Sequence, residues 1–268
     1  MGGFWTYGNS ISGAPIDYPA IFGANYYDHW RPWNAASLTI TSPPLVDAIA
    51  SLTGSGRSFS TSVATSRPTL LLDGAIGKNV LDFDGVNEFL RVLSSSTDYN
   101  FLHDGSGGCV VVVAKPDTSA TGIVLRNFSG STDVGFSEVV ISNSYNTAVA
   151  RGVSGAFTLV NNSGSGAASG SYFSKVSVYD ADNGTAADRS EVYLSGGVAI
   201  KNNVLTNAPS VTNATSNLTM GVLPPLNISF PFDGKIAEVI IINTIPTPTQ
   251  LAAVQARLEY DYTTFPIT

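Results

Sequence analysis

The sequence predicts an all-β fold in which two antiparallel sheets pack face to face as a sandwich. Short apolar runs rich in β-branched residues recur along the chain, and turn-forming Gly, Asp and Asn residues separate them. The tripeptide Phe-Asp-Gly occurs twice, at 83–85 and 232–234, and Asp-Gly is a strong signal for a tight turn. Strands do not alternate with long helices, which disfavours a parallel α/β sheet. We therefore expect two turns, near the front and the back of one large domain.

The size and charge of the chain limit its class. Its 268 residues are enough for one large domain whose core needs no disulfide. The single cysteine, Cys109, lies in an apolar run and is expected to be a buried hydrophobic residue rather than a nucleophile. A formal charge of −7 with scattered Lys and Arg disfavours nucleic acid as a partner. We expect no export signal and no membrane span, because the sequence shows neither pattern.

Residues 1–33 differ in composition from the rest, so we predict an extended N-terminal arm followed by a sandwich spanning 34–268. The arm holds nine aromatic residues, including every tryptophan, and its Pro and Gly residues argue against a helix or a long strand. Burying nine rings would contribute roughly 45 kcal/mol, whereas ordering the arm costs roughly 50 kcal/mol. The arm must therefore dock on a surface, either its own sandwich or a neighbouring subunit. The residues expected to dock on a partner are Phe4, Trp5, Tyr7, Trp30 and Trp33.

From residue 34 onward, the pattern is one of successive strands. The run 108–115 is apolar up to its last residue, Lys115, so we expect a central strand that is covered on both faces. The stretch 67–92 is expected to hold two or three short strands, and the spacing of apolar residues over 42–56 permits a short helical turn. Further strands are expected within 35–42, 122–128, 134–142, 148–153, 156–162, 172–181, 189–200, 217–223 and 235–243.

One helix is well signalled, near the C-terminal end of the chain over 247–262. Thr247 and Gln250 form a capping box, and a proline occupies the first helical position between them. Leu251, Val254 and Leu258 fall on one face of this helix. We expect that face to cover one end of the sandwich.

Three segments resemble concanavalin A-like, or laminin G-like, jelly-roll domains. The segment 67–92, RPTLLLDGAIGKNVLDFDGVNEFLRV, is similar to their first strands, and 217–262 is similar to their closing block. EVYLSGGVAI, at 191–200, resembles a strand of that family in which Ser195 replaces the usual asparagine. The resemblance implies a two-sheet antiparallel jelly roll, an architecture that hosts lectins, hydrolases, lyases and interaction modules. The layout of arm and jelly roll resembles virion proteins of tailed bacteriophages.

The residue patterns of catalysis are missing from the sequence, so we expect that the protein is not an enzyme. Glycan hydrolysis needs two carboxylates close together, but Glu138, Glu191 and Glu238 each stand apart along the chain. The two histidines, His29 and His103, are expected in loops or at the surface rather than in a lyase site. The G-x-S-x-G elbow of serine hydrolases does not occur either.

The most acidic loop, 179–191, superficially resembles a calcium loop. Counted from Asp180 as the first position, its glycine stands at the fifth position rather than at the sixth, which favours a solvated loop between two strands. A weak Ca²⁺ site at Asp180, Asp182 and Asp188 stays open as the alternative, and no other cofactor is expected. Tyr145 and Tyr172 would stack on sugar rings if they lay at a rim, although such strand residues more often face the core.

The leading hypothesis from the sequence is a non-enzymatic virion protein of a bacteriophage, a capsid decoration or a tail fibre component. It would be made in the host cytoplasm and lie on the virion surface, with other virion proteins and further copies of itself as partners. The alternative is a carbohydrate-binding, lectin-like module that contacts a cell-surface glycan. A polysaccharide-degrading enzyme is the third hypothesis.

Overall fold

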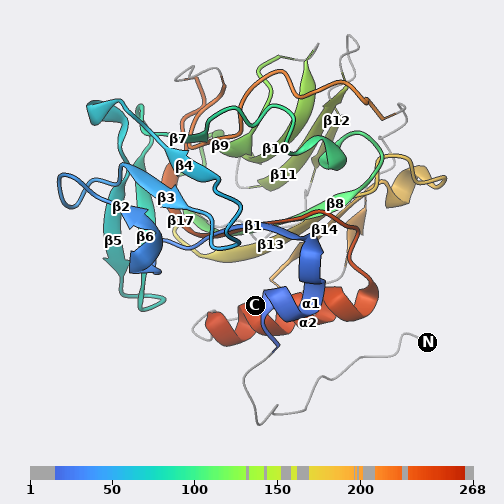
Figure 1. Cartoon of the computed structure of the whole chain (residues 1–268), viewed down its shortest axis with the longest axis horizontal. Coiled ribbons are helices and arrows are strands. Elements are labelled where there is room, and N and C mark those ends of the chain that lie inside the picture. The colour runs from blue at the N-terminus through green and yellow to red at the C-terminus, as the bar shows by residue number, and fades with distance from the viewer. Residues whose placement is uncertain are drawn as a thin grey trace.

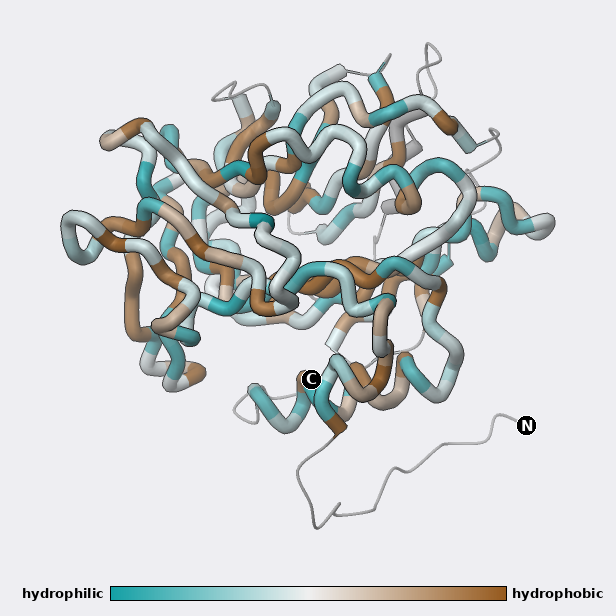
Figure 2. The backbone as a smooth tube through the Cα atoms, viewed as in Figure 1, coloured by the Kyte–Doolittle hydropathy of each residue, from teal (hydrophilic) through white to brown (hydrophobic). Residues whose placement is uncertain are grey.

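The computed structural model describes residues 16–130, 133–141, 144–151, 158–161, 169–195, 197, 199–201, 209–224 and 229–262. These residues form two antiparallel sheets packed as a sandwich, which confirms the predicted all-β class. The hydrophobic strands run through the middle of the molecule and appear as brown tube in Figure 2. None of the helices in the described part of the chain is long and apolar enough to cross a membrane.

Sheet A has the strand order β15-β14-β13-β8-β17-β6-β5, and β1 also pairs with β17. Its strands are β1 (Tyr26–Trp30), β5 (Thr69–Asp73), β6 (Lys78–Asp84), β8 (Gly108–Pro116), β13 (Phe173–Tyr179), β14 (Ser190–Leu194), β15 (Ile200–Lys201) and β17 (Asp233–Ile242). Strand β8 is central and buried on both faces, as its apolar sequence predicts. Cys109 at its start is buried in this strand, which confirms the expected hydrophobic role.

Sheet B has the strand order β12-β11-β10-β9-β16-β7-β4-β3-β2. Its strands are β2 (Leu38–Thr39), β3 (Ala48–Ala50), β4 (Ser58–Ser60), β7 (Leu90–Val92), β9 (Gly122–Arg126), β10 (Val134–Ile141), β11 (Ser144–Arg151), β12 (Thr158–Asn161) and β16 (Thr219–Met220). The helical turn expected within 42–56 is wrong, because β3 occupies this stretch and pairs with β2 and β4. Short 3₁₀ turns join the strands at Gly23–Asn25, Ala35–Ser37, Ala64–Ser66, Asn100–Leu102 and Ala186–Asp188.

Two α-helices, α1 (Tyr18–Phe22) and α2 (Pro248–Asp261), lie against each other on the outer face of sheet A (Figure 1). Helix α2 begins with the predicted capping box, and its Val254 and Leu258 are buried. It covers a face of the sandwich rather than an end, because these side chains pack on outward-facing residues of β8 and β17.

The N-terminal arm is more regular than its composition suggests. The expectation of no helix within it is wrong, since α1 forms there. The strand β1 is only five residues long, which agrees with the expectation of no long strand. A proline in the first turn of α1 is tolerated because that position needs no hydrogen-bonded N–H. Strand β1 pairs with β17, so the predicted boundary at residue 33 does not separate the arm from the sandwich.

The two Phe-Asp-Gly copies, far apart in sequence, lie side by side in sheet A. Asp84 of β6 pairs with Asp233 of β17, and the rings of Phe83 and Phe232 meet edge to face at 6.2 Å. The first copy makes the predicted turn, with Gly85 at a φ of +71°. The second copy is not a turn, because Asp233 already begins β17. A Cβ atom at Gly85 would lie 2.6 Å from the Cβ of Asp233, so the pairing leaves room only for glycine.

Three Gly→Ala variants separate the two reasons for a glycine at position 85, which are its positive φ and its close approach to Asp233. Gly85→Ala introduces both the strained φ and the clash with Asp233, Gly77→Ala introduces only a strained φ of +63°, and Gly74→Ala introduces neither. A left-handed alanine costs about 1–2 kcal/mol, so we expect the free energy of unfolding to fall most for Gly85→Ala, less for Gly77→Ala and least for Gly74→Ala. Urea denaturation measures this order. Equal losses for Gly85→Ala and Gly77→Ala would show that the close approach is unimportant.

Candidate functional site

The outer faces of the two sheets differ in what covers them. Helices α1 and α2 cover that of sheet A, and neither lies over sheet B (Figure 1). A groove of about 280 Å³ opens beside β7 and β16 of sheet B. We call it the sheet B groove and define it by its lining residues, which are Arg91, Ser96, Thr215, Ser216, Asn217, Thr219 and Pro224.

Strand register places the polar residues of this groove. Leu90 and Val92 of β7 point into the core between the sheets, so Arg91 projects from the outer face. Thr219 pairs with Arg91 on one side and with Arg126 of β9 on the other. Paired residues of neighbouring strands share a face, so two arginines flank Thr219 on the outside of sheet B.

The two arginines differ in their contacts. Arg126 donates from Nε to the carbonyl oxygen of Phe128 at 2.7 Å and from Nη2 to that of Ser129 at 3.1 Å, and its guanidinium lies over the Phe128 ring. Burial lowers the pKa of Arg126 to about 10, partly offset by the negative charge of Asp133. Arg91 is half-buried and lines the groove.

Chain segments on either side of the strands complete the groove. The main-chain N–H of Ser95 donates to Oδ1 of Asn217 at 2.9 Å, which fixes the amide. Thr215 is tied to the start of β10 through Val134, whose N–H donates to Thr215 Oγ1 at 2.9 Å. The hydroxyls of Ser96 and Ser216 make no hydrogen bond within the described part of the chain. The groove therefore combines a fixed frame with hydroxyl groups that a ligand can contact.

A second polar centre lies buried under the helices, around Glu238 of β17. A β-bulge between Ile236 and Glu238 turns this carboxylate away from the core between the sheets. It accepts hydrogen bonds from Nε2 of His29 at 2.6 Å, Nε of Arg31 at 2.5 Å and the Tyr262 hydroxyl at 2.9 Å. We call these four residues the Glu238 cluster. It joins β1, β17 and the end of α2 at one point.

Charge and burial set the protonation of the Glu238 cluster. Burial opposes ionisation of Glu238, but the hydrogen bond from His29 and the charge of Arg31 outweigh it and hold the pKa of Glu238 at about 2. Burial lowers the pKa of His29 and outweighs the effect of Glu238. A neutral His29 that donates through Nε2 accepts at Nδ1, where the Tyr26 hydroxyl lies. Arg31 therefore supplies the charge that balances Glu238.

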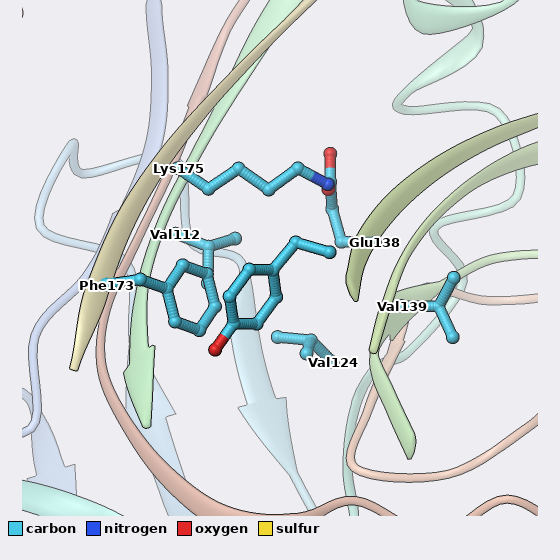
Figure 3. Close-up of a pocket in the computed structure, with 7 residues that line it drawn as sticks. Val112, Val124, Glu138, Val139, Phe173 and Lys175 are labelled. Atoms are coloured by element: carbon cyan, nitrogen blue, oxygen red, sulfur yellow. The ribbon is translucent and has the colours of Figure 1, made fainter. Parts of the chain in front are cut away.

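A third polar centre crosses the interior of the sandwich between the sheets. Lys175 of β13 pairs with Glu138 of β10, and the Tyr179 hydroxyl donates to Oε1 of Glu138 at 2.7 Å. Burial lowers the pKa of Lys175 despite the nearby carboxylate. Figure 3 shows both side chains at a cavity of about 10 Å³, walled by Val112, Val124, Val139, Tyr145 and Phe173. That space has room for one water molecule at most, so this centre is a structural tie and not a ligand site.

The residues predicted to dock on a partner are used within the chain where the structure describes them. Trp30 is 1% exposed, lies in the core and contacts Phe59 edge to face, which corrects its assignment as a partner-docking residue. Trp33 is half-buried between the side chains of Arg31 and Lys78. Both contacts correspond to the alternative in which the arm packs on its own sandwich. Phe4, Trp5 and Tyr7 lie outside the described residues.

The acidic loop is a connection between β13 and β14. Asp180 accepts a hydrogen bond from the Asn183 amide at 2.7 Å, and Asp188 pairs with Lys201 at 2.6 Å. Glu191, twelve positions into the loop counted from Asp180, pairs with Lys201 as well. Asp182 is exposed beside them. Among the described residues, no group of three or more acidic, Cys or His side chains is placed to hold a metal ion.

Four polar residues are buried where the sequence suggested isolation or exposure. His29 is 1% exposed and lies in β1, so its expected place in a loop or at the surface is wrong. His103 lies in a turn, as the loop alternative had it, but it is 0% exposed and not at the surface. Glu138 and Glu238 have close partners that come from distant parts of the chain. The available signal was a charged residue inside an apolar strand, which requires a buried partner. Tyr145 is 2% exposed and faces the core, as the more frequent alternative had it.

Comparisons with known proteins place the fold. No family model matches the chain, and no curated protein matches its sequence. A Trypanosoma rangeli sialidase is similar with a TM-score of 0.60 and 10% identity, over 93% of this chain and 37% of the sialidase. The binding domain of botulinum neurotoxin serotype D gives a TM-score of 0.54 and 8% identity, over 86% of this chain and 50% of that domain.

These two likenesses agree with the all-β sandwich fold of the chain. A carbohydrate-binding module of a Ruminococcus gnavus sialidase is similar at a TM-score of 0.49 and 14% identity, over 66% of this chain and 96% of the module. The chain spans about half of the toxin domain and about a third of the sialidase. At these identities, what is shared is the fold.

The Glu238 cluster predicts a specific pH dependence. His29 is held neutral in the folded state, whereas an unfolded histidine takes up a proton below about pH 6.5. The unfolded state then binds more protons, so folding stability falls as the pH drops, by at most about 1.4 kcal/mol per unit. We expect the free energy of unfolding of the wild type, relative to His29→Gln, to fall between pH 7.5 and 5. A difference that stays constant over this range in urea titrations would show that His29 is not held neutral.

Proposed function

We propose that this chain is a non-catalytic, lectin-like module that binds glycans through the sheet B groove. The observation that carries the proposal is the groove itself, where an arginine, hydroxyls and an amide converge on the sheet face that the helices leave free. Sugars present many hydroxyl groups, and such side chains bind them by donating and accepting hydrogen bonds. The volume of about 280 Å³ is near the lower limit for a small-ligand site.

The absence of catalysis is part of the proposal and is supported by the state of the two buried glutamates. Hydrolysis of a glycan needs carboxylates that reach the scissile bond. Glu138 and Glu238 are 1% and 0% exposed, and each is held by a cation and a tyrosine hydroxyl. The cavity at Glu138 admits one water molecule, which leaves no room for a sugar.

Filling the groove tests the glycan-binding proposal. Ser96 lines the groove with an unbonded hydroxyl, so Ser96→Phe places a large ring in the ligand space. We expect the wild type to bind members of a glycan array and Ser96→Phe to lose at least tenfold in affinity. Thr249→Phe is the matched control, because Thr249 is exposed on α2 over the opposite sheet. The proposal fails if the wild type binds no glycan, or if both variants bind as the wild type does.

A finer proposal is that the module is displayed on a bacteriophage virion and held there by the N-terminal residues. Its support is the distribution of the arm's aromatic residues. Trp30 and Trp33 contact the chain's own sandwich, which leaves Phe4, Trp5 and Tyr7 as the predicted partner-docking residues.

Deleting residues 1–15 tests this anchoring role. Because α1 and β1 begin after this segment, we expect the shortened chain to keep its melting temperature and its glycan binding. We expect it to lose co-sedimentation with assembled particles. Undiminished co-sedimentation of the shortened chain would rule out anchoring by these residues.

A further inference from the structure

Arg91 stands apart from the other arginines whose side chains the structure describes. Arg31, Arg57, Arg67 and Arg257 each form an ion pair with an aspartate or a glutamate. Two more arginines donate to main-chain carbonyls. Within the described part of the chain, the side chain of Arg91 makes neither a hydrogen bond nor an ion pair, and only its main chain pairs with neighbouring strands. A half-buried guanidinium with unused donors is a binding group that lacks its acceptor.

The residues that line the groove around Arg91 bring no carboxylate to it. Arg126 lies two strands away on the same face, about 10 Å distant by strand spacing, and Asp133 acts on its charge. Asp and Glu do not occur in the groove lining, which consists of one arginine and uncharged residues. The groove is therefore a local cationic site on a chain with a net charge of −7.

From this geometry we infer that the sheet B groove binds a sugar that carries a carboxylate group, with Arg91 as the residue that selects it. The inference rests on the proposed glycan-binding function and adds the chemical class of the ligand. A guanidinium presents two parallel N–H groups that match the two oxygens of a carboxylate. The hydroxyls of Ser96 and Ser216 then lie available for the sugar hydroxyls.

The arrangement of charge favours a single anionic sugar over a polyanion. A polyanion such as nucleic acid needs a row of cations along its path, and the groove lining offers one arginine. The rest of the chain carries an excess of acidic residues, 20 against 13 basic ones. One carboxylate seated on Arg91 gains the local attraction without extending over these acidic residues.

The test uses oligosaccharides prepared in two forms, with free uronic-acid carboxylates and as their methyl esters. Calorimetric titration of the whole chain measures the affinity for both forms. We expect the free acids to bind at least tenfold more tightly than the esters, and added salt to weaken only the acids. We expect Arg91→Gln to weaken the acids by about 10- to 100-fold and to leave the esters unchanged. Arg91→Lys keeps the positive charge but lacks the two parallel N–H groups of a guanidinium, so its affinity for the acids should lie between those of the wild type and Arg91→Gln.

Arg67→Gln is the matched control, since Arg67 pairs with Asp47 outside the groove; it should bind as the wild type does. The melting temperature of Arg91→Gln should equal that of the wild type, because the substitution keeps the main-chain pairing of β7 and the Arg91 side chain bonds to no described residue. Equal binding of acids and esters overturns the inference but leaves glycan binding intact. Binding of sulfated sugars alone overturns the carboxylate assignment, and binding of no sugar overturns the proposed function as well.

Discussion

The buried carboxylate of Glu238 is the constraint on which the arrangement of this chain depends. An unpaired charge in an apolar interior costs several kcal/mol, so β17 can be central only if donors reach Glu238. They come from β1, through His29 and Arg31, and from the C-terminal end of α2, through Tyr262. Arg31 also reaches Asp261 of α2 at 3.1 Å. The two ends of the described chain are therefore held together by one side chain in the middle of a sheet.

Glu238 holds β1 and the end of α2 to sheet A, and a second buried ion pair holds the two sheets to each other. Lys175 in sheet A and Glu138 in sheet B form an ion pair across the core. If one sheet slid over the other, both charges would lose their partner inside the protein, which is costly. The buried carboxylates of Glu238 and Glu138 are both paired in this way, whereas the Arg91 side chain in the groove of sheet B keeps unused donors. The unpaired Arg91 is informative because the protein pairs its other buried charges so completely.

Much of the fold could be predicted from local pattern. A few neighbouring residues suffice to predict the buried strand β8 from its apolar run and the start of α2 from its capping box, and both are present in the structure. The Glu238 cluster could not be predicted, because His29 and Glu238 are 209 positions apart and the sequence around either residue gives no sign that the other is its partner. The bulge that aims Glu238 at the helices also shifts the alternation of β17, which hides the carboxylate's direction. The groove depends in the same way on strand order, since β7, β16 and β9 are neighbours only in the folded sheet.

The net negative charge of the chain is compatible with an anion-binding groove, and it limits the anions that fit there to small ones. At physiological salt, charges further apart than about 8 Å are largely screened, so an approaching anion responds mainly to the residues it touches. Those in the groove are neutral except for Arg91. A long polyanion would lie over acidic surface as well and gain little. Under the proposed function, the chain disfavours nucleic acid and still holds a small carboxylate, because Arg91 is the charged residue that lines the groove.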